Sequence, residues 1–250
     1  MSLHGKSLFV TGGNAGIGLA TALEFAARGA DIAIYARRAD KNEEAKQEIE
    51  KAGVRCITFT ADATDEASIA GAVDETVKTF GGLHYAFNNV GVSQRGTPVV
   101  DLSVDEYEYL MDGNVKSTFL AMKHEIPAIL ATGRGGAICN NASASGIAPV
   151  AQQALYGAAK FGVIGLTKAV ALEYAKDDLR VNVVCPGATT GDMFLRFREE
   201  FPEHAEKAAA AHPMARIGLR EEVARAVLFL CTGATFTTGL AFTVDGGRSL

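Results

Sequence analysis

A tyrosine and a lysine four residues apart are the most chemically suggestive pair in this 250-residue chain. Tyr156 and Lys160 occur in the stretch ALYGAAKFG, which begins at Ala154 and has the character of a helix. Because residues four apart share one face of a helix, the phenol and the ammonium group can converge on one point. A positive charge beside a phenol lowers its pKa, so Tyr156 could exchange a proton near neutral pH. The plainer alternative is a packed tyrosine next to a solvated lysine.

A glycine-rich turn near the start of the chain could hold a nucleotide. Residues 11–18 read TGGNAGIG, at the end of the apolar run 7–12 and where the next helix is expected to begin. Glycines permit a tight turn and close approach of a pyrophosphate, and the amino end of a helix offers free N–H groups. The spacing is Gly-x-x-x-Gly-x-Gly, not the Gly-x-Gly-x-x-Gly of the common dinucleotide fingerprint. Tight packing of a strand against a helix is the alternative interpretation.

The residues after the second apolar run indicate which nucleotide is bound. An NAD site usually carries an acidic residue there, which holds the ribose hydroxyls. Here the run 31–36 is followed by Arg37 and Arg38, with no carboxylate. A guanidinium group matches the geometry of a phosphate, so the two arginines predict binding of a 2'-phosphate and therefore NADP. A solvated basic turn is the alternative.

Seven short apolar runs alternate with longer amphipathic stretches. The expected strands cover 7–12, 31–36, 55–61, 83–89, 136–143, 180–187 and 240–247, and the expected helices cover 16–28, 41–52, 66–80, 105–132, 156–176 and 221–231. Strands that are apolar on both faces and separated by helices indicate a parallel sheet covered on both sides. We therefore expect one doubly wound Rossmann-type α/β domain over 1–250, with a seven-stranded parallel sheet. The segment 188–215, which follows the sixth strand and contains no strand, is expected to form a short substrate lid.

Composition and charge argue against several other classes of protein. The net charge of −5 provides no basic stripe for a nucleic acid. The four cysteines have no Cys-x-x-Cys spacing and the five histidines have no ligand spacing, so neither a disulfide framework nor a metal site is expected. No apolar run is long enough for a signal peptide or a membrane span. The sequence therefore predicts a cytoplasmic protein with no membrane partner.

Several motifs, in order, make nearly the whole chain resemble the classical short-chain dehydrogenase/reductase family. The run NNVG at 88–91 is similar to that family's Asn-Asn-Ala-Gly strand end, and Asp62 stands where the family's aspartate contacts adenine. Tyr156 with Lys160 matches the family's Tyr-x-x-x-Lys pair, and Ser143 precedes Tyr156 by the usual thirteen residues. The resemblance implies four catalytic residues, Asn114, Ser143, Tyr156 and Lys160. Together with the glycine turn and the arginine pair, it predicts a cofactor site formed by Gly12, Asn14, Gly16, Ile17, Gly18, Arg37, Arg38, Asp62, Ala63, Asn89, Gly91, Tyr156, Lys160, Pro186, Gly187 and Thr189.

This resemblance implies an oxidoreductase that uses NADP, with NAD as the alternative, to interconvert a secondary alcohol and a ketone. Tyr156 is expected to act as the general acid/base, and Lys160 to lower its pKa and to hold the nicotinamide ribose. Ser143 is expected to hydrogen-bond the substrate oxygen, and Asn114 to anchor a water molecule that relays protons. The hydride transfer itself is chemistry of the cofactor.

Two departures from the family pattern concern the cofactor. The family often carries a threonine five residues after the proline of the PG pair at 186–187, where it steadies the carboxamide. That place is taken by Gly191, preceded by Thr189 and Thr190. NADP-dependent members often have a basic residue just before the second motif glycine, where this chain has Ala15. This second departure leaves NAD possible.

The substrate and the partners are less constrained. Apolar side chains in the expected lid suggest an apolar or cyclic secondary alcohol or ketone, or else form the core face of a lid helix: Met193, Phe194, Leu195, Phe197 and Phe201. A 3-oxoacyl carrier-protein reductase is an alternative, because Gln153, three residues before Tyr156, also occurs in those enzymes. An NADP-binding sensor or interaction protein without activity is the alternative from another class, although it would not need all four catalytic residues. The expected partners are a small-molecule substrate and, from the resemblance, further copies of the chain in a homotetramer paired through the long helices and the last strand.

Overall fold

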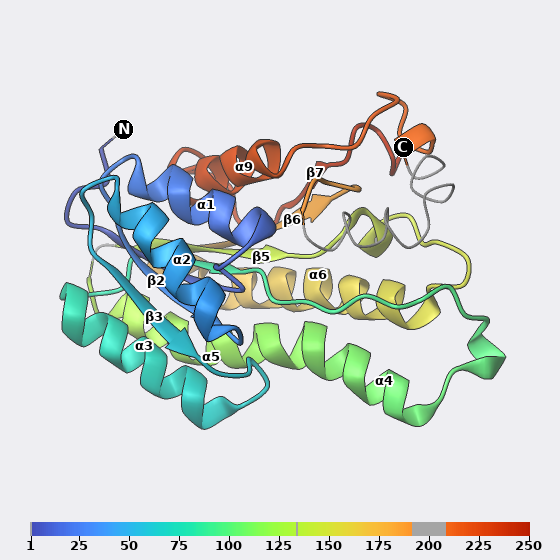
Figure 1. Ribbon diagram of the computed structural model, residues 1–250, viewed down its shortest axis with the longest axis horizontal. Helices are drawn as coiled ribbons and strands as arrows, with labels where there is room; N and C mark the ends of the chain where they lie inside the picture. Colours follow the sequence, from blue (N-terminus) through green and yellow to red (C-terminus); the bar gives the residue numbers. More distant parts are fainter. Residues whose placement is uncertain (1, 134, 192–208) are drawn as a thin grey trace.

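The computed structural model describes residues 2–133, 135–191 and 209–250, and there the chain forms a parallel sheet with helices on both faces (Figure 1). The strands are β1 (Ser7–Thr11), β2 (Asp31–Ala36), β3 (Cys56–Thr60), β4 (Tyr85–Asn88), β5 (Gly136–Asn141), β6 (Leu179–Pro186) and β7 (Ala241–Val244). Their order across the sheet is β3-β2-β1-β4-β5-β6-β7, and every neighbouring pair is parallel. All seven predicted strands form, and the expected fold class is confirmed.

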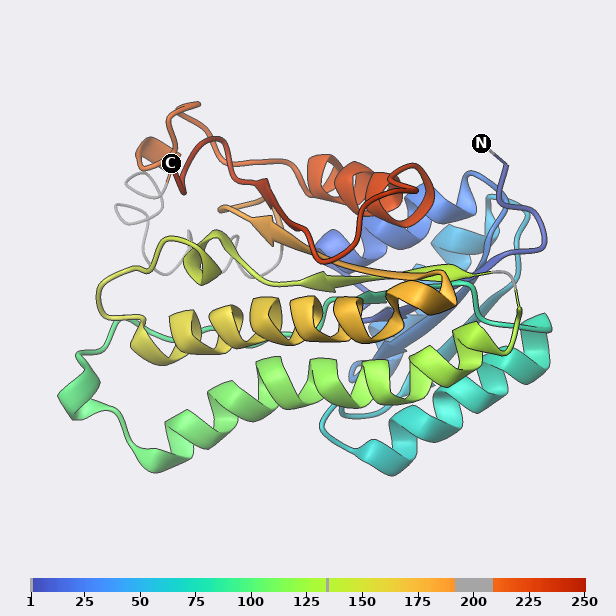
Figure 2. The same ribbon diagram turned by 180° about the vertical axis from the view of Figure 1, so that it is seen from behind.

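Two layers of helices cover the two faces of the sheet (Figures 1 and 2). One layer consists of α1 (Gly16–Ala26), α2 (Ala39–Glu50) and α9 (Arg220–Thr232), with α1 packed against α9. The other consists of α3 (Glu66–Phe80), α4 (Val104–Met111), α5 (Ser117–Leu130) and α6 (Ala154–Tyr174), with α5 packed against α3. Short 3₁₀ turns lie at η1 (Val99–Asp101), η3 (Ala144–Gly146) and η4 (Ala175–Asp177). Each layer buries its own apolar cluster against the sheet, which is why the strands are apolar on both faces.

The strand order changes direction between β1 and β4. The chain builds β1, β2 and β3 outward on one side, then returns to place β4 beside β1 and continues to β7 on the other. Thr11 and Asn88, the last residues of these two strands, lie opposite each other. Ligands of open parallel sheets bind beyond the carboxyl ends of the strands at such a reversal point.

The helix predicted over 105–132 is interrupted in its middle. It forms as α4 and α5 with a π-helical turn, η2 (Asp112–Lys116), between them. The hydroxyls of Ser117 and Thr118 donate to backbone carbonyls one turn earlier, and the Asn114 amide donates to the carbonyl of Leu110. Such side-chain bonds compete with the regular helical ladder, and π turns are frequent at functional sites. The prediction of one continuous helix is therefore wrong at Asn114.

Most of the expected lid, residues 192–208, lies outside the described residues. The described residues on either side of it contact each other just beyond the carboxyl end of β6. Thr189 forms a parallel bridge with Gly218, and the backbone N–H of Ala188 donates to His212 Nε2 at 3.1 Å. His212 is 4% exposed, so a buried imidazole holds the backbone at Ala188, just after β6.

In the part of the chain that the structure describes, one helix, over Ala154–Asp177, has the length and apolar composition that a membrane span would need. It comprises α6 and η4, and α6 packs against β6. Its buried side chains include Lys160, Val163, Thr167 and Val170. The apolar residues of α6 are therefore explained in part by the face that it packs against the sheet.

Candidate active site

The glycine turn lies at the carboxyl end of β1. Gly12 and Gly16 have φ values of 66° and 55°, which favour glycine. A Cβ at Gly18 would overlap the carbonyl oxygen of Gly12 and lie 2.7 Å from Asn89 Nδ2, so α1 approaches the turn as closely as glycine allows. The amino end of α1 has no side-chain cap. Its first N–H groups can therefore bind a phosphate, and the turn fits the pyrophosphate of a dinucleotide. Ile17 is half-buried in the first turn of α1.

Asn42 on α2 is a residue that the sequence did not single out. It is 1% exposed, and its side-chain oxygen accepts a hydrogen bond from Asn14 Nδ2 at 2.8 Å. Its Nδ2 donates to the carbonyl of Ala36 at 3.1 Å and to Thr60 Oγ1 at 3.0 Å. Asn42 thus joins the glycine turn to the ends of β2 and β3. No sequence motif marks it, because its partners come from three separate segments.

Arg37 and Asp62, which the sequence assigned to different parts of the cofactor, lie beside each other. Arg37 Nη1 is 3.8 Å from Asp62 Oδ2, and both side chains are largely exposed. The backbone N–H and the hydroxyl of Thr64 donate to Asp62, and these bonds lower the pKa of Asp62, with a smaller effect from Arg37. Ala63 is buried next to Asp62, and Arg38 is half-buried. The guanidinium expected to bind a 2'-phosphate is therefore already close to a carboxylate.

Ser143, Tyr156 and Lys160 come together at the carboxyl end of β5. Ser143 follows β5, and Tyr156 and Lys160 lie in the first two turns of α6. The Ser143 and Tyr156 side chains are hydrogen-bonded, and Lys160 Nζ is 5.7 Å from the centre of the Tyr156 ring. The sheet and α6 thus bring three of the four predicted catalytic residues into one cluster.

The pKa of Tyr156 differs from the expectation. Burial raises it above its ordinary value of 10.0, and the hydrogen bond with Ser143 opposes this effect. Lys160 does not lower it in the chain alone, because the ammonium points to a backbone carbonyl and not to the phenolic oxygen. In the chain without cofactor, burial therefore outweighs any lowering of the Tyr156 pKa, and the expected lowering by Lys160 together with the oxidised nicotinamide ring stays a prediction.

Lys160 is buried against Gly91, where a larger residue would be crowded. Lys160 is 4% exposed, and its Nζ donates to the carbonyl of Asn141 at 3.2 Å. A Cβ at Gly91 would lie 3.1 Å from this Nζ and 2.9 Å from Asn114 Oδ1. Burial lowers the pKa of Lys160 to about 8. The ammonium group and the chain after β4 are therefore in close contact.

Asn114 uses its side chain to hold the segment after β4. Its Nδ2 donates to the carbonyls of Leu110 and Val92, at 2.8 and 3.0 Å, and its Oδ1 accepts from the N–H of Val92 at 3.3 Å. The π turn places this fully buried amide against Gly91 and Val92. The side chain that was expected to anchor a water molecule is thus bonded to protein backbone.

The remaining predicted cofactor residues lie at the same edge of the sheet. Asn89 Nδ2 donates to the carbonyl of Gly12 at 3.1 Å and joins β4 to the glycine turn. Pro186 ends β6, and a Cβ at Gly187 would lie 2.5 Å from His212 Nε2. Gly191, two residues after Thr189, approaches Gly16, since a Cβ on Gly191 would lie 3.7 Å from the Gly16 Cα. The predicted site residues therefore surround one region, from the end of β3 to the end of β6.

Gln94, in the segment after β4, caps the helix that carries Tyr156. Its Oε1 accepts from the backbone N–H groups of Leu155 and Tyr156, both at 3.0 Å, and its Nε2 donates to the carbonyl of Gln152 at 3.1 Å. Gln153, at the N-cap position of α6, makes no side-chain cap. Gln94 is 8% exposed and supplies that cap from 61 and 62 residues away in the chain. The missing cap before Ala154 was the signal that the sequence offered.

We predict that Gln94→Leu lowers kcat while cofactor affinity stays the same. Losing a cap and leaving buried N–H groups unpaired costs about 1–2 kcal/mol, so a fall in kcat of about tenfold is expected. Gln94→Glu keeps an acceptor for both N–H groups and should retain more activity than the leucine variant. Steady-state kinetics and cofactor titration measure the two effects. Equal activity in the leucine variant and the unmodified protein would contradict the assigned role.

Comparison with known proteins identifies the family. A family model described as Enoyl-(Acyl carrier protein) reductase matches residues 12–249. The chain is 37% identical over 247 residues to 2,5-dichloro-2,5-cyclohexadiene-1,4-diol dehydrogenase of Sphingobium indicum, covering 98% of this chain and 97% of that protein. It belongs to the short-chain dehydrogenase/reductase family. This short-chain dehydrogenase/reductase is also 37% identical to a cyclohexanol dehydrogenase of an Acinetobacter species, over 97% of this chain and 94% of that protein.

Solved structures of other members have the same fold. L-sorbose reductase from Gluconobacter frateurii, in complex with NADPH and L-sorbose, aligns with a TM-score of 0.94 at 28% identity and covers 100% of this chain and 98% of that chain. NAD⁺-bound xylitol dehydrogenase aligns with a TM-score of 0.93 at 30% identity and covers 99% of this chain and 100% of that chain. A nicotinamide cofactor is therefore common to these neighbours, whose cofactors differ in the 2'-phosphate. The family and its relatives make this chain an oxidoreductase acting on CH–OH groups.

Proposed function

We propose that this short-chain dehydrogenase/reductase interconverts a cyclic or otherwise apolar secondary alcohol and its ketone, with NADP preferred over NAD. The observation that supports it most strongly is the cluster of Ser143, Tyr156 and Lys160 beside Gly91, at the same sheet edge as the glycine turn. Two relatives named for cyclic alcohols support the substrate class. The side chains expected to line the lid lie outside the described residues and add nothing to this proposal.

The proposed chemistry assigns one role to each residue. The nicotinamide cofactor supplies or accepts the hydride when bound. Tyr156 donates a proton to the carbonyl oxygen in reduction and removes it from the hydroxyl in oxidation. Ser143 donates a hydrogen bond to the same oxygen and stabilises its developing charge. Lys160 binds the ribose of the cofactor, and Asn114 fixes the segment at Val92, next to the Gly91 that lies against Lys160 Nζ.

The preference for NADP rests on Arg37 and Arg38, and Asp62 opposes it. Arg37→Ala is expected to raise the dissociation constant for NADPH about tenfold, because a charge-assisted bond to phosphate contributes about 1.5 kcal/mol. The constant for NADH should stay within about twofold, since NADH has no 2'-phosphate. Nicotinamide fluorescence titrations at fixed salt measure both constants. An unchanged ratio would show that Arg37 serves only Asp62.

Assays with purified protein test the reaction itself. Oxidation of cyclohexanol and of cyclic diols, and reduction of the matching ketones, would be followed by nicotinamide absorbance with each cofactor. Turnover of these compounds supports the proposal. Turnover of a 3-oxoacyl thioester alone would favour the carrier-protein reductase instead. Cofactor binding without turnover of any CH–OH or carbonyl compound would contradict the assigned role of Tyr156.

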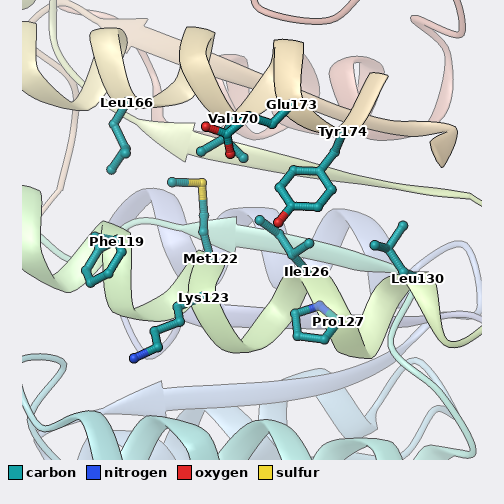
Figure 3. A pocket seen from close by; sticks show the side chains of 10 residues that line it. All are labelled: Phe119, Met122, Lys123, Ile126, Pro127, Leu130, Leu166, Val170, Glu173 and Tyr174. Carbon is teal, nitrogen blue, oxygen red and sulfur yellow. The ribbon is translucent and has the colours of Figure 1, made fainter. Parts of the chain in front are cut away.

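We further propose a homotetramer whose subunits pair through α5 and α6. A groove of about 320 Å³ lies between these helices (Figure 3). Its apolar lining is Phe119, Met122, Ile126, Pro127, Leu130, Leu166, Val170 and Tyr174, with Lys123 and Glu173 as its charged members. Phe119, 47% exposed, and Leu172, 81% exposed on the same helix pair, extend the apolar surface that a second copy would cover. Light scattering tests this directly, because a tetramer has four times the 26.2 kDa mass of the chain.

A cytoplasmic location completes the proposal. All four cysteines are free and buried, and none forms a disulfide. Burial raises the pKa of each thiol, so they are not reactive thiolates. Such a set of thiols suits a reducing compartment.

A further inference from the structure

A carboxyl group with no part in the proposed chemistry is buried beneath the active site. Glu125 lies on α5 and is 0% exposed. Its Oε2 accepts a hydrogen bond from Asn88 Nδ2 at 2.9 Å. Asn88 is the last residue of β4, and Asn140, opposite it on β5, is also fully buried. A lone carboxylate in such surroundings is costly, so this group needs an explanation.

The hydrogen bonds around Glu125 form a chain that runs from Asn88 through Asn140 and Thr167 to the carbonyl of Val163. The carbonyl of Val163 can only accept, and the Thr167 hydroxyl donates to it at 2.7 Å. Thr167 Oγ1 then accepts from Asn140 Nδ2 at 2.9 Å. Asn140 Oδ1 in turn accepts from Asn88 Nδ2 at 3.0 Å. In this direction Asn88 presents its amide nitrogen to both Asn140 and Glu125.

This arrangement leaves two buried oxygens without a partner, Asn88 Oδ1 and Glu125 Oε1. Both are acceptors if Glu125 is ionised, so neither could satisfy the other. They belong to the same two groups that already share one hydrogen bond. A proton on Oε1 would donate to Asn88 Oδ1 and complete a two-bond pair between a carboxylic acid and an amide.

We propose that Glu125 is protonated in the folded protein and acts as a positioning residue, its acid–amide pair with Asn88 anchoring a hydrogen-bond chain through Asn140 and Thr167 to α6. Oε1–H donates to Asn88 Oδ1, and every polar atom of the Glu125 carboxyl and the Asn88 amide is then paired. The chain joins α5, β4, β5 and α6. It lies beneath Lys160, since Val163 and Thr167 follow that lysine by one and two helical turns.

The electrostatics of the site agree with this protonation. Burial raises the pKa of Glu125 from 4.5 to about 8, and the bond from Asn88 opposes the rise. The lysines on the packed elements have partners elsewhere: Lys123 pairs with Glu66 of α3, Lys116 pairs with Asp112 in η2, and Lys160 of α6 bonds the carbonyl of Asn141. The imidazole of His124 on α5 lies beside Glu66, 3.4 Å from it. Tyr85 on β4 and Cys139 on β5 are neutral groups whose pKa values are raised by burial. Within residues 2–133, 135–191 and 209–250, no positive charge therefore compensates an ionised Glu125.

The neighbours of the two asparagines explain what the chain positions. Asn141, next to Asn140, supplies the carbonyl that accepts from Lys160 Nζ. Asn89, next to Asn88, bonds Asn141 Nδ2 at 2.8 Å and the carbonyl of Gly12. The buried chain therefore fixes the strand ends from which the lysine and the glycine turn are held. The link to turnover rests on the proposed function, whereas the proton on Glu125 does not.

Infrared spectroscopy tests the proton directly. The difference spectrum between the unmodified protein and Glu125→Gln near neutral pH is expected to contain the C=O stretching band of one protonated carboxylic acid, shifted in heavy water. Glutamine can form the same two bonds with Asn88, so the variant should fold. Absence of that band would overturn the assignment, and this readout needs neither cofactor nor substrate.

The pH dependence of stability gives a second test. Because the folded pKa is raised, the stabilising contribution of Glu125 is complete below pH 4.5 and is lost as the pH rises to about 8. Relative to Glu125→Gln, the folding constant of the unmodified protein should fall by up to about tenfold per pH unit in this range and level off above it. Urea unfolding of both proteins measures the difference. Parallel pH profiles would contradict a protonated Glu125.

Glu125→Met separates positioning from folding. Methionine has a similar size but forms neither bond, so kcat is expected to fall about tenfold, with cofactor affinity within about threefold. Glu125→Gln should restore kcat to within about threefold of the unmodified protein. Circular dichroism confirms that both variants are folded. Full activity in a folded methionine variant would overturn the positioning role. If the unmodified protein were also inactive, the proposed function would be contradicted, and the infrared test of the proton on Glu125 would still stand.

Discussion

Replacing Tyr156 with phenylalanine is expected to lower kcat by about 10³-fold and to leave NADPH affinity within about twofold. The change removes one oxygen atom and keeps the ring, so packing at the start of α6 is retained. The lost hydroxyl is the one hydrogen-bonded to Ser143 and is the only phenol in the cluster with Lys160 among the described residues. General acid/base catalysis contributes about 10²–10⁴ to a rate, which sets the expected size. Steady-state kinetics with a cyclic ketone measures it.

Tyr174→Phe is the matched control for this experiment. Tyr174 lies at the other end of the same helix and lines the groove between α5 and α6 (Figure 3). It should keep activity close to that of the unmodified protein. If Tyr156→Phe lost no more than about tenfold in kcat, the proton would have to come from another group.

The pKa of Tyr156 ties this residue to the cofactor. Burial raises it, and Lys160 does not offset the rise in the chain alone. The remaining positive charge near the phenol would be that of the oxidised nicotinamide ring. Because Tyr156 must be deprotonated to act as the base in oxidation, we expect the acid limb of kcat in that direction to lie below the pKa of Tyr156 in the free protein, as titration of both states by ultraviolet absorbance would show.

The elements that the sequence predicts well are those with local causes. Apolar runs separated by amphipathic stretches depend on neighbouring residues alone, and the seven strands follow from them. The meeting of Ser143 with Tyr156 and Lys160 was implied by the family resemblance, through the order and spacing of the motifs. Motif spacing and topology were sufficient for these features.

What the sequence did not predict depends on contacts between distant segments. Gln94 caps α6, Asn42 joins three strand and turn ends, and the Glu125 chain joins four elements. The π turn at Asn114 also has such a cause, because the amide bonds Val92, 22 residues away. Side-chain hydrogen bonds of this kind leave no periodic pattern, and a polar residue in a helix gives the same signal whether it is solvated or buried.

Gly18→Ala is expected to raise the dissociation constants for NADPH and NADH together by about 10–100-fold. The new Cβ would overlap the Gly12 carbonyl oxygen and lie 2.7 Å from Asn89 Nδ2, which are themselves joined by a hydrogen bond. The Gly12 carbonyl belongs to the turn that would surround the pyrophosphate, and Asn89 holds that carbonyl from the end of β4, so the turn must move away from α1. Overpacking of this kind costs about 1–3 kcal/mol, which corresponds to the stated range if the loss falls on binding.

Gly71→Ala is the control that shows whether weaker cofactor binding comes from crowding at the turn or from any exchange of glycine for alanine in a helix. Gly71 lies inside α3 with nothing within 4 Å of an added Cβ, so alanine there should raise stability by about 1 kcal/mol and leave cofactor affinity unchanged. Fluorescence titration and thermal unfolding of both variants separate affinity from stability. A folded Gly18→Ala protein that bound NADPH normally would mean that the pyrophosphate does not lie at this turn. Because both cofactors share the pyrophosphate, this variant also differs from Arg37→Ala, which should affect NADPH alone.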